Sequence, residues 1–137
     1  MKATTILFMV LAFGLSTAAS AQKEVKEVYY DNGEVKMSQE LEDGVEDGVF
    51  TIYYENGVVK EKGFYENGAK TGEWKRWNEE GQLIAVANYK DGMKHGDWKI
   101  WDDQGVLRYD LSYEQDTKID ISYMYDENGD LLSQKAH

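Results

Sequence analysis

Two stretches of this sequence that copy each other decide the fold. Residues 65–74 read YENGAKTGEW and residues 89–98 read YKDGMKHGDW, so the second stretch repeats the first with a 24-residue period. In both, a tyrosine leads to a glycine, a second glycine follows at the fourth position after it, and a tryptophan ends the stretch. Self-similarity at a fixed period of this length indicates a repeat architecture.

The glycines extend this period along the chain. Every glycine after Ala21 except Gly63 belongs to a series that keeps the 24-residue step. The series are Gly33, Gly57, Gly81, Gly105 and Gly129; Gly44, Gly68 and Gly92; and Gly48, Gly72 and Gly96. Because no insertion breaks the step, the sequence predicts units of equal length.

The large apolar residues keep the same step. Their rows are Phe50, Trp74 and Trp98; Tyr53, Trp77, Trp101 and Tyr125; Val35, Val59, Leu83, Leu107 and Leu131; and Leu41, Tyr65, Tyr89 and Tyr113. Side chains alternate between the two faces of a strand, and the step is an even number. Each unit therefore returns its large residues to the same face.

Each unit predicts a β-hairpin. Pairs such as Asn56-Gly57 favour a tight turn, and the alternation of apolar residues after such a turn indicates a strand. A wider loop, residues 67–72, then leads into an aromatic strand, residues 73–77. The pattern predicts an all-β fold, an extended antiparallel meander of ten strands built from tandem 24-residue β-hairpin repeats.

We predict one repeat domain, residues 22–137. It holds four full repeats at about 30–53, 54–77, 78–101 and 102–125, with a half-repeat at each end. The glycines expected to define the turns are Gly33, Gly57, Gly81 and Gly105, with Gly68, Gly72, Gly92 and Gly96 in the wider loops.

The Asn-Gly turns leave two registers open. A two-residue turn pairs Tyr54 with Val59 and puts the row of Phe50 on the alternating apolar face, whereas a three-residue loop with a glycine bulge brings up the row of Tyr53. We favour the first, because it sets the large residues on both sides of the wider loop on one face. Gly57 then needs a positive φ, while Gly63 lies in mid-strand, so valine should destabilise more at Gly57 than at Gly63.

The segment 1–21 predicts a cleavable signal peptide. Lys2 provides a positive start, residues 6–15 are almost wholly apolar, and Ala19-Ser20-Ala21 fits the cleavage pattern before Gln22. A spanning helix needs roughly 20 apolar residues, so we expect no stable membrane insertion after cleavage. The sequence has no cysteine, which excludes a lipid-anchored form and disulfides. The expected location is the periplasm or the extracellular medium.

The charge of the chain limits its partners. The formal net charge is −11. Affinity for nucleic acid depends on lysine and arginine contacts to phosphate, so a nucleic-acid partner is not expected.

The unit Asn-Gly-x-Leu…Tyr-x-x-Gly-x-x-x-Gly-x-Trp-x-x-Trp resembles the bacterial MORN-repeat variant family, whose members are often described as antitoxin-like. Residues 65–74 and 89–98 match its core, and the likeness covers Val28 to about Leu132. The resemblance implies a β-hairpin array used for binding and implies no catalytic residues. An antitoxin of a cytoplasmic toxin would stay in the cytoplasm, which conflicts with the export signal. The antitoxin-like role that agrees with export is immunity against a toxin that acts outside the cytoplasm.

The fourth unit departs from the pattern. Asp116 and Asp120 stand where the other units have glycine, and Ser122 stands in place of an aromatic residue. Terminal repeats often differ because they cap the array, and we interpret this unit as such a cap.

The sequence offers little for catalysis or cofactors. Its two histidines, His95 in a loop and His137 at the C-terminus, fit no metal-ligand or nucleophile–base spacing. The acidic turns at residues 102–105 and 126–130 lack the full ligand set of a calcium loop. We therefore predict a protein that is not an enzyme and has no cofactor.

The aromatic rows predict a binding surface. Residues three apart face opposite sides of a strand, so the two tryptophan rows lie on opposite faces, and an exposed aromatic strip usually marks a partner surface. The candidate surface residues are Tyr53, Trp77, Trp101 and Tyr125. The expected partner is a protein, with self-association or a stacked glycan as alternatives. The rival function is a carbohydrate or cell-envelope binding protein.

Overall fold

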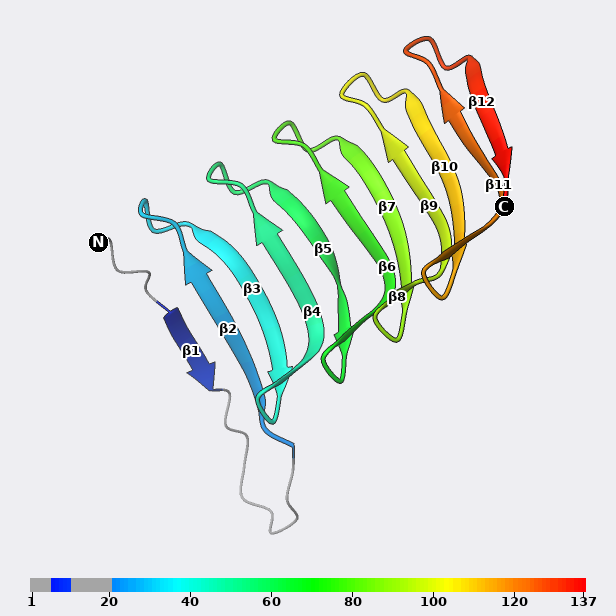
Figure 1. Ribbon diagram of the computed structural model, residues 1–137. Coiled ribbons are helices and arrows are strands. Elements are labelled where there is room, and N and C mark those ends of the chain that lie inside the picture. The colour runs from blue at the N-terminus through cyan, green and yellow to red at the C-terminus, as the bar shows by residue number, and fades with distance from the viewer. Residues whose placement is uncertain (1–5, 11–20) are drawn as a thin grey trace.

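The computed structural model describes residues 6–10 and 21–137 of the chain (Figure 1). The described residues form one twelve-stranded antiparallel sheet, in which strands consecutive in sequence are neighbours except that β8 and β9 both pair with β7. The strands are β1 (Ile6–Val10), β2 (Lys23–Tyr29), β3 (Val35–Glu42), β4 (Val45–Tyr53), β5 (Val59–Glu66), β6 (Ala69–Trp77), β7 (Leu83–Lys90), β8 (Met93–Lys94), β9 (Gly96–Trp101), β10 (Leu107–Glu114), β11 (Thr117–Tyr125) and β12 (Leu131–Ala136). The predicted all-β meander is confirmed.

Strands β2 to β12 correspond to the ten predicted strands, because β8 and β9 are parts of one strand separated by His95. The remaining strand, β1, belongs to the predicted leader and pairs with β2 through partners such as Ile6 and Val28. The rest of the leader, apart from Ala21, lies outside the described residues. Among the described residues, no helix is long and apolar enough to cross a bilayer.

The tight turns of the sheet lie at the lower edge of Figure 1. Asn67 has a φ of 49° and Gly68 a φ of 80°, and β6 begins at the next residue. Two successive left-handed residues are the mark of a two-residue type I′ turn. The prediction of a wider loop over residues 67–72 is therefore wrong, and Gly72 (φ 65°) lies inside β6 instead.

The turns at Asn32-Gly33, Asn56-Gly57 and Asn128-Gly129 lie at the upper edge of Figure 1 and are longer. The Gly57 amide donates to the Tyr54 carbonyl at 3.0 Å, and the Tyr54 amide donates to the Val58 carbonyl at 2.8 Å. Of the loop residues Glu55, Asn56 and Gly57, only Gly57 has a positive φ. This is a three-residue loop with a glycine bulge, so the predicted two-residue turn is wrong.

The predicted strand register is nevertheless found. Tyr53 is opposite Val59, but Ile52 is opposite Glu61, so Lys60 is an extra residue on β5. The longer loop shifts the register by one residue, and this second bulge shifts it back by one. The same register shift follows each of the other upper-edge turns, which contain Gly33, Gly81, Gly105 and Gly129.

The face that carries Phe50, Trp74 and Trp98, called the inner face here, holds the core. Trp74 is only 3 % exposed. Its ring centroid lies 5.6 Å from that of Phe50 and 5.2 Å from that of Tyr65. Aromatic and small residues alternate across the central strands in the order Phe50, Gly63, Trp74, Ala87 and Trp98.

Gly63 makes room for the Trp74 indole. A Cβ atom at Gly63 would lie 2.1 Å from Cδ2 of that indole, which is far inside van der Waals contact. The expectation that valine is tolerated at Gly63 is therefore wrong. The reason is the packing of the cross-strand tryptophan, not the backbone of the glycine, whose φ is not positive.

Trp98 is less buried than we expected from its row. It is half-buried, with its ring 5.2 Å from Tyr89 and 5.3 Å from Tyr113. Trp74 has Phe50 as a third aromatic neighbour besides Tyr65 and Tyr89, whereas the ring contacts of Trp98 are those to Tyr89 and Tyr113.

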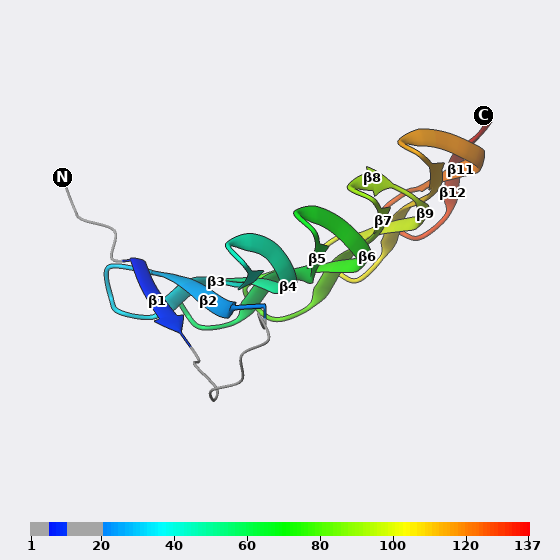
Figure 2. The ribbon, with the colours of Figure 1, turned by 90° about the horizontal axis from the view of Figure 1, so that it is seen from below.

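The lower hairpins arch out of the mean plane of the sheet (Figure 2). Register shifts near the arches, between Gln39 and Leu41 and between Lys62 and Phe64, are the bulges that bend the strands. Lys70, from one arch, reaches to 3.8 Å from the centroid of the Trp74 ring. The arches therefore close over the inner face.

Candidate binding surface

The four predicted surface residues occupy equivalent places. Each is the last residue of its strand, on the face opposite to Trp74, which is called the outer face here. They are Tyr53 of β4, Trp77 of β6, Trp101 of β9 and Tyr125 of β11, and all four are half-buried. They form a line along the upper edge of the sheet.

An aliphatic residue stands beside each of them. The Cα partners of the four are Val59, Leu83, Leu107 and Leu131, each the first residue of the following strand. The bulge that follows each of these residues reverses the side-chain alternation and so turns the aliphatic side chain to the outer face. Leu83 is 36 % exposed and Leu131 is 52 % exposed, so part of this apolar surface meets solvent. We call these eight residues the outer band.

Tyr29 belongs to the same line, although it is not among the four predicted surface residues. It ends β2, and its Cα partner Val35 begins β3. The 24-residue step back from Tyr53 would have found it. Its hydroxyl donates to the Glu27 carboxylate, and this hydrogen bond is the main cause that raises the Tyr29 pKa.

Hydrogen bonds fix the backbone of the outer band. The Tyr30 hydroxyl donates to the Tyr53 carbonyl at 2.7 Å, and the Tyr54 hydroxyl donates to the Trp77 carbonyl at 3.0 Å. Arg108 Nε donates to the Tyr125 carbonyl at 2.9 Å. With two strands per unit, successive rings of the band are ~10 Å apart along the sheet. A surface held in this way loses little conformational freedom on binding.

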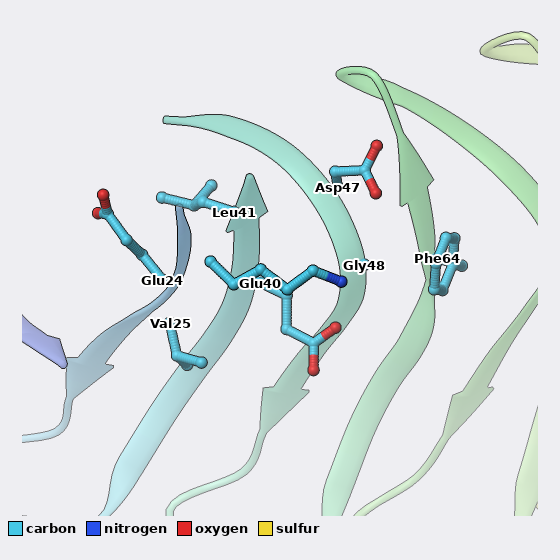
Figure 3. A pocket seen from close by; sticks show the side chains of 8 residues that line it. Glu24, Val25, Glu40, Leu41, Asp47, Gly48 and Phe64 are labelled. Atoms are coloured by element: carbon cyan, nitrogen blue, oxygen red, sulfur yellow. The ribbon is translucent and has the colours of Figure 1, made fainter. Parts of the chain in front are cut away.

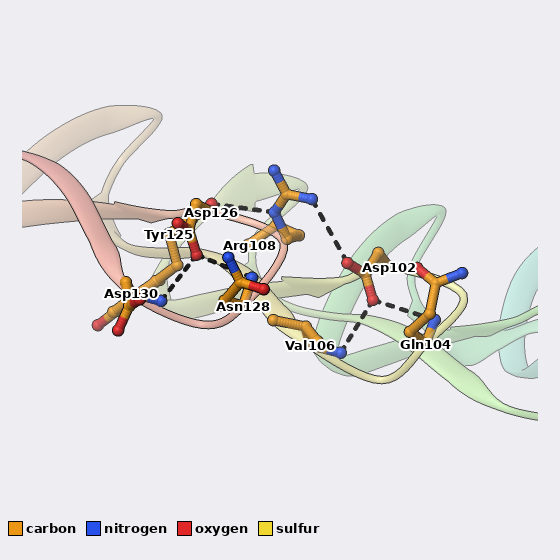
Figure 4. A network of polar contacts seen from close by, with 8 residues as sticks. All are labelled: Asp102, Gln104, Val106, Arg108, Tyr125, Asp126, Asn128 and Asp130. Carbon is orange, nitrogen blue, oxygen red and sulfur yellow. Dashed lines mark hydrogen bonds and ion pairs between the residues drawn. The ribbon is translucent and has the colours of Figure 1, made fainter.

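In the acidic turns beside the band, an aspartate side chain accepts hydrogen bonds from the backbone amides of its own turn (Figure 4). Asp126 Oδ1 accepts from the amides of Asn128 and Asp130, at 2.8 and 2.9 Å. The hydrogen bond from the Asp130 amide, with that from Asn128, holds the pKa of Asp126 below its usual value. The Asp126 carboxylate therefore stabilises the conformation of its own turn.

Asp102 does the same in the preceding unit. Partial burial works against its ionisation, but hydrogen bonds from the Val106 amide, the Arg108 guanidinium and the Gln104 amide outweigh it and lower the pKa of Asp102. The Gln104 and Val106 amides lie 3.0 and 2.9 Å from Asp102 Oδ1.

A cavity of about 360 Å³ opens near the lower end of β2 to β5 (Figure 3). It is lined by Lys23, Glu24, Val25, Glu40, Leu41, Asp47, Gly48 and Phe64. Glu40 Oε2 accepts from the Val49 amide at 2.8 Å, and Asp47 Oδ2 accepts from the Asn67 amide at 3.0 Å. These two carboxylates support the bulged backbone of the arches.

Within the described residues, histidine and acidic side chains do not converge as a metal site would require. His95 lies between β8 and β9, its side chain is half-buried, and its amide donates to the Asn88 carbonyl of β7 at 2.9 Å. His137 Nε2 lies 2.9 Å from the Ser122 hydroxyl.

Comparison with known proteins agrees with the repeat geometry. The MORN repeat variant family matches residues 46–67, 70–91 and 94–115, so successive matches keep the 24-residue step of the hairpins. No curated protein matches the chain significantly. The matches follow one another from β4 to β10, and the chain belongs to the MORN repeat variant family.

Proposed function

We propose that this protein is an exported, non-enzymatic scaffold that binds a protein partner through its outer band. The observation that supports this best is the line of Tyr53, Trp77, Trp101 and Tyr125 on the face opposite to the core. Trp74 and its neighbours already form the core on the inner face, so folding does not need the outer aromatic residues to the same degree.

A protein partner suits the composition of the band. Aromatic residues are enriched at the energetically dominant positions of protein interfaces, where flat rings pack against a matching surface. MORN repeats are generally found in binding and scaffold proteins. Immunity against a toxin that acts outside the cytoplasm is a role compatible with this proposal.

Export is part of the proposal and has its own test. Mass spectrometry of the protein recovered from the periplasm or the medium should give a chain that begins at Gln22. A recovered chain that still carries Met1 contradicts the cleavage.

The binding role is tested with variants of the band. The protein and its Trp77→Ala and Trp101→Ala variants serve as baits for the envelope fraction of the source cells, and the bound proteins are identified by mass spectrometry. Both substitutions should abolish capture of the partner, as the loss of an aromatic hot spot does. Leu132→Ala is the matched control, because Leu132 is 58 % exposed and lies outside the band. Capture that survives both tryptophan substitutions contradicts the proposal.

A glycan is the second candidate, favoured by the regular ~10 Å spacing of flat rings, which suits stacking on every second sugar of an extended chain. Soluble glycans are titrated into the protein while tryptophan fluorescence is recorded. This experiment distinguishes a glycan partner from a protein partner. A saturable change that Trp77→Ala removes would favour the glycan.

A further inference from the structure

The second and third units each hold a lysine ammonium group over two aromatic rings of the inner face. Lys70 Nζ lies 3.8 Å from the centroid of the Trp74 ring and 5.2 Å from that of Tyr89. Lys94 Nζ, one unit later, lies 4.9 Å from Trp98 and 5.0 Å from Tyr113. These distances are within the range of a cation–π interaction. Two units of the chain thus place a lysine ammonium group against a pair of inner-face aromatic rings.

The first unit has the two rings but a different residue in place of the lysine. Phe50 and Tyr65 correspond to Trp74 and Tyr89, and their centroids are 5.6 Å apart at an interplanar angle of 82°. The two rings of the second unit are 6.1 Å apart at 73°. Glu46 stands at the position of Lys70 and Lys94.

A cavity of about 370 Å³ lies over these rings. It is lined by Glu24, Lys26, Met37, Gln39, Leu41, Gly44, Glu46, Phe50 and Tyr65, which come from β2 to β5 and one arch. Phenylalanine is smaller than tryptophan, and glutamate is shorter than lysine. The space that Trp74 and Lys70 fill in the second unit is therefore open in the first, and its volume suits one long side chain.

The charges of the cavity favour a cation. Glu24 and Glu46 line it, against Lys26 as the single basic residue of the lining. Burial raises the pKa of Tyr65, and the nearby Glu46 and Glu61 carboxylates add to this, in agreement with a Glu46 carboxylate beside the ring. In the second unit Lys70 Nζ also lies 3.5 Å from Glu61 Oε1, so ring and carboxylate contacts combine there.

We propose that this inner-face cavity binds a lysine side chain supplied by a protein partner. The ammonium group lies against the Phe50 and Tyr65 rings beside Glu46, and the aliphatic stem runs along Met37 and Leu41. The net charge of −11 attracts a basic segment to the protein from a distance. The site is on the opposite face from the outer band and does not depend on it.

The probe for this site is Nα-acetyl-lysine amide, titrated into the ¹⁵N-labelled full chain. Amide resonances of Glu46, Phe50 and Tyr65 should shift with an affinity in the millimolar range, as expected for one side chain. The Nε-acetylated form of the probe has the same backbone and stem but no charge. It should bind about tenfold more weakly or not at all.

Glu46→Lys is the decisive variant, because it gives the first unit the residue that the second and third units have. The new lysine should lie over Phe50 and Tyr65, and the shifts caused by the probe should be lost while the spectrum stays folded. Glu55→Lys makes the same charge change in an exposed turn at the upper edge and should leave binding intact.

Three results would overturn the proposal: no shifts at these residues, equal binding of the neutral probe, or unchanged binding by Glu46→Lys. Trp77→Ala should not alter the titration, so a failure of this site and a failure of the outer band can be told apart.

Discussion

Gly63 and Trp74 are the pair of residues that defines the core. The indole occupies the position of a Cβ atom at residue 63, so any larger residue there has to displace it. Gly63→Ala should lower the free energy of unfolding by ~1–3 kcal/mol, as overpacking of a core does. Urea denaturation followed by circular dichroism measures this loss.

A double-mutant cycle provides the control for Gly63. In the Trp74→Ala background the indole is gone, and Gly63→Ala should cost little or even stabilise the strand, because glycine is unfavourable in a strand interior. An equal cost of Gly63→Ala in both backgrounds would show that backbone conformation, not packing, requires the glycine.

The two tryptophan rows should differ in stability. Trp74→Ala removes a 3 % exposed side chain and should cost ~3–5 kcal/mol, as large-to-small core changes do. Trp77→Ala removes a half-buried side chain of the outer face and should cost ~1 kcal/mol. Thermal and urea unfolding of the two variants test this. If both variants unfold, the outer band is part of the core and not a partner surface.

The rows themselves were predictable from the sequence, but their packing was not. The 24-residue step places Phe50, Trp74 and Trp98 on one face without any structural information. The step says nothing of what lies across the strand, and so Gly63, the one glycine outside the series, looked replaceable. Its role depends on the rotamer of a residue on the next strand, which only the structure provides.

Among the elements, the turns show the largest difference between expectation and structure. An Asn-Gly pair suits a two-residue turn with two left-handed residues and also a three-residue loop in which only the glycine is left-handed. Both occur here, at Asn67-Gly68 and Asn56-Gly57 respectively. The predicted lengths of these two turns are reversed in the structure, yet the predicted register is correct because the bulge at Lys60 compensates for the longer loop.

The last tight turn is the weakest of its kind, and it can be improved. Gln115 has a φ of 46°, the left-handed conformation that Asp43, Asn67 and Asp91 adopt at the same place. Asparagine tolerates this conformation better than glutamine. Gln115→Asn should therefore raise the free energy of unfolding by ~0.5–1 kcal/mol, measured by urea denaturation. The reverse change, Asn67→Gln, should destabilise by a similar amount, and a neutral result for both would contradict the argument.

The turn at Asp126 makes stability depend on pH. Its hydrogen bonds to turn amides favour the ionised carboxylate in the folded state and lower its pKa from the ordinary 3.8. The stabilisation is present above the unfolded-state value and is lost as the pH falls through the folded-state value. Asp126→Ala should thus be less stable than the wild type at pH 7, and the gap should narrow below about pH 4. A constant gap for Asp126→Ala would contradict the assignment.

The whole molecule is a single curved layer in which each strand contacts mainly its neighbours in sequence (Figure 1). Within the described residues, no large side chain is completely buried. Stability in such an array approximates a sum over units and the interfaces between them, so it should differ along the sheet. The fourth unit keeps the backbone geometry of the others, since Asp116 and Asp120 adopt left-handed φ angles of 64° and 57° where glycines stand elsewhere. It does not supply an aromatic residue at Ser122, and the row of ring contacts ends at Tyr113.

Protection against hydrogen exchange should follow this gradient. Amides of β5, β6 and β7 surround Trp74 and should exchange most slowly, whereas every residue of β12 is exposed and its outer edge has no strand partner among the described residues. Opening of the end strand breaks one interface, while opening of a central strand breaks two and uncovers the indole. Native-state exchange measured by NMR should therefore give opening free energies that fall from the centre to β12. Trp74→Ala should remove the central maximum and leave the exchange of β12 unchanged. Uniform protection along the sheet would mean that the array unfolds as one cooperative unit, against this description.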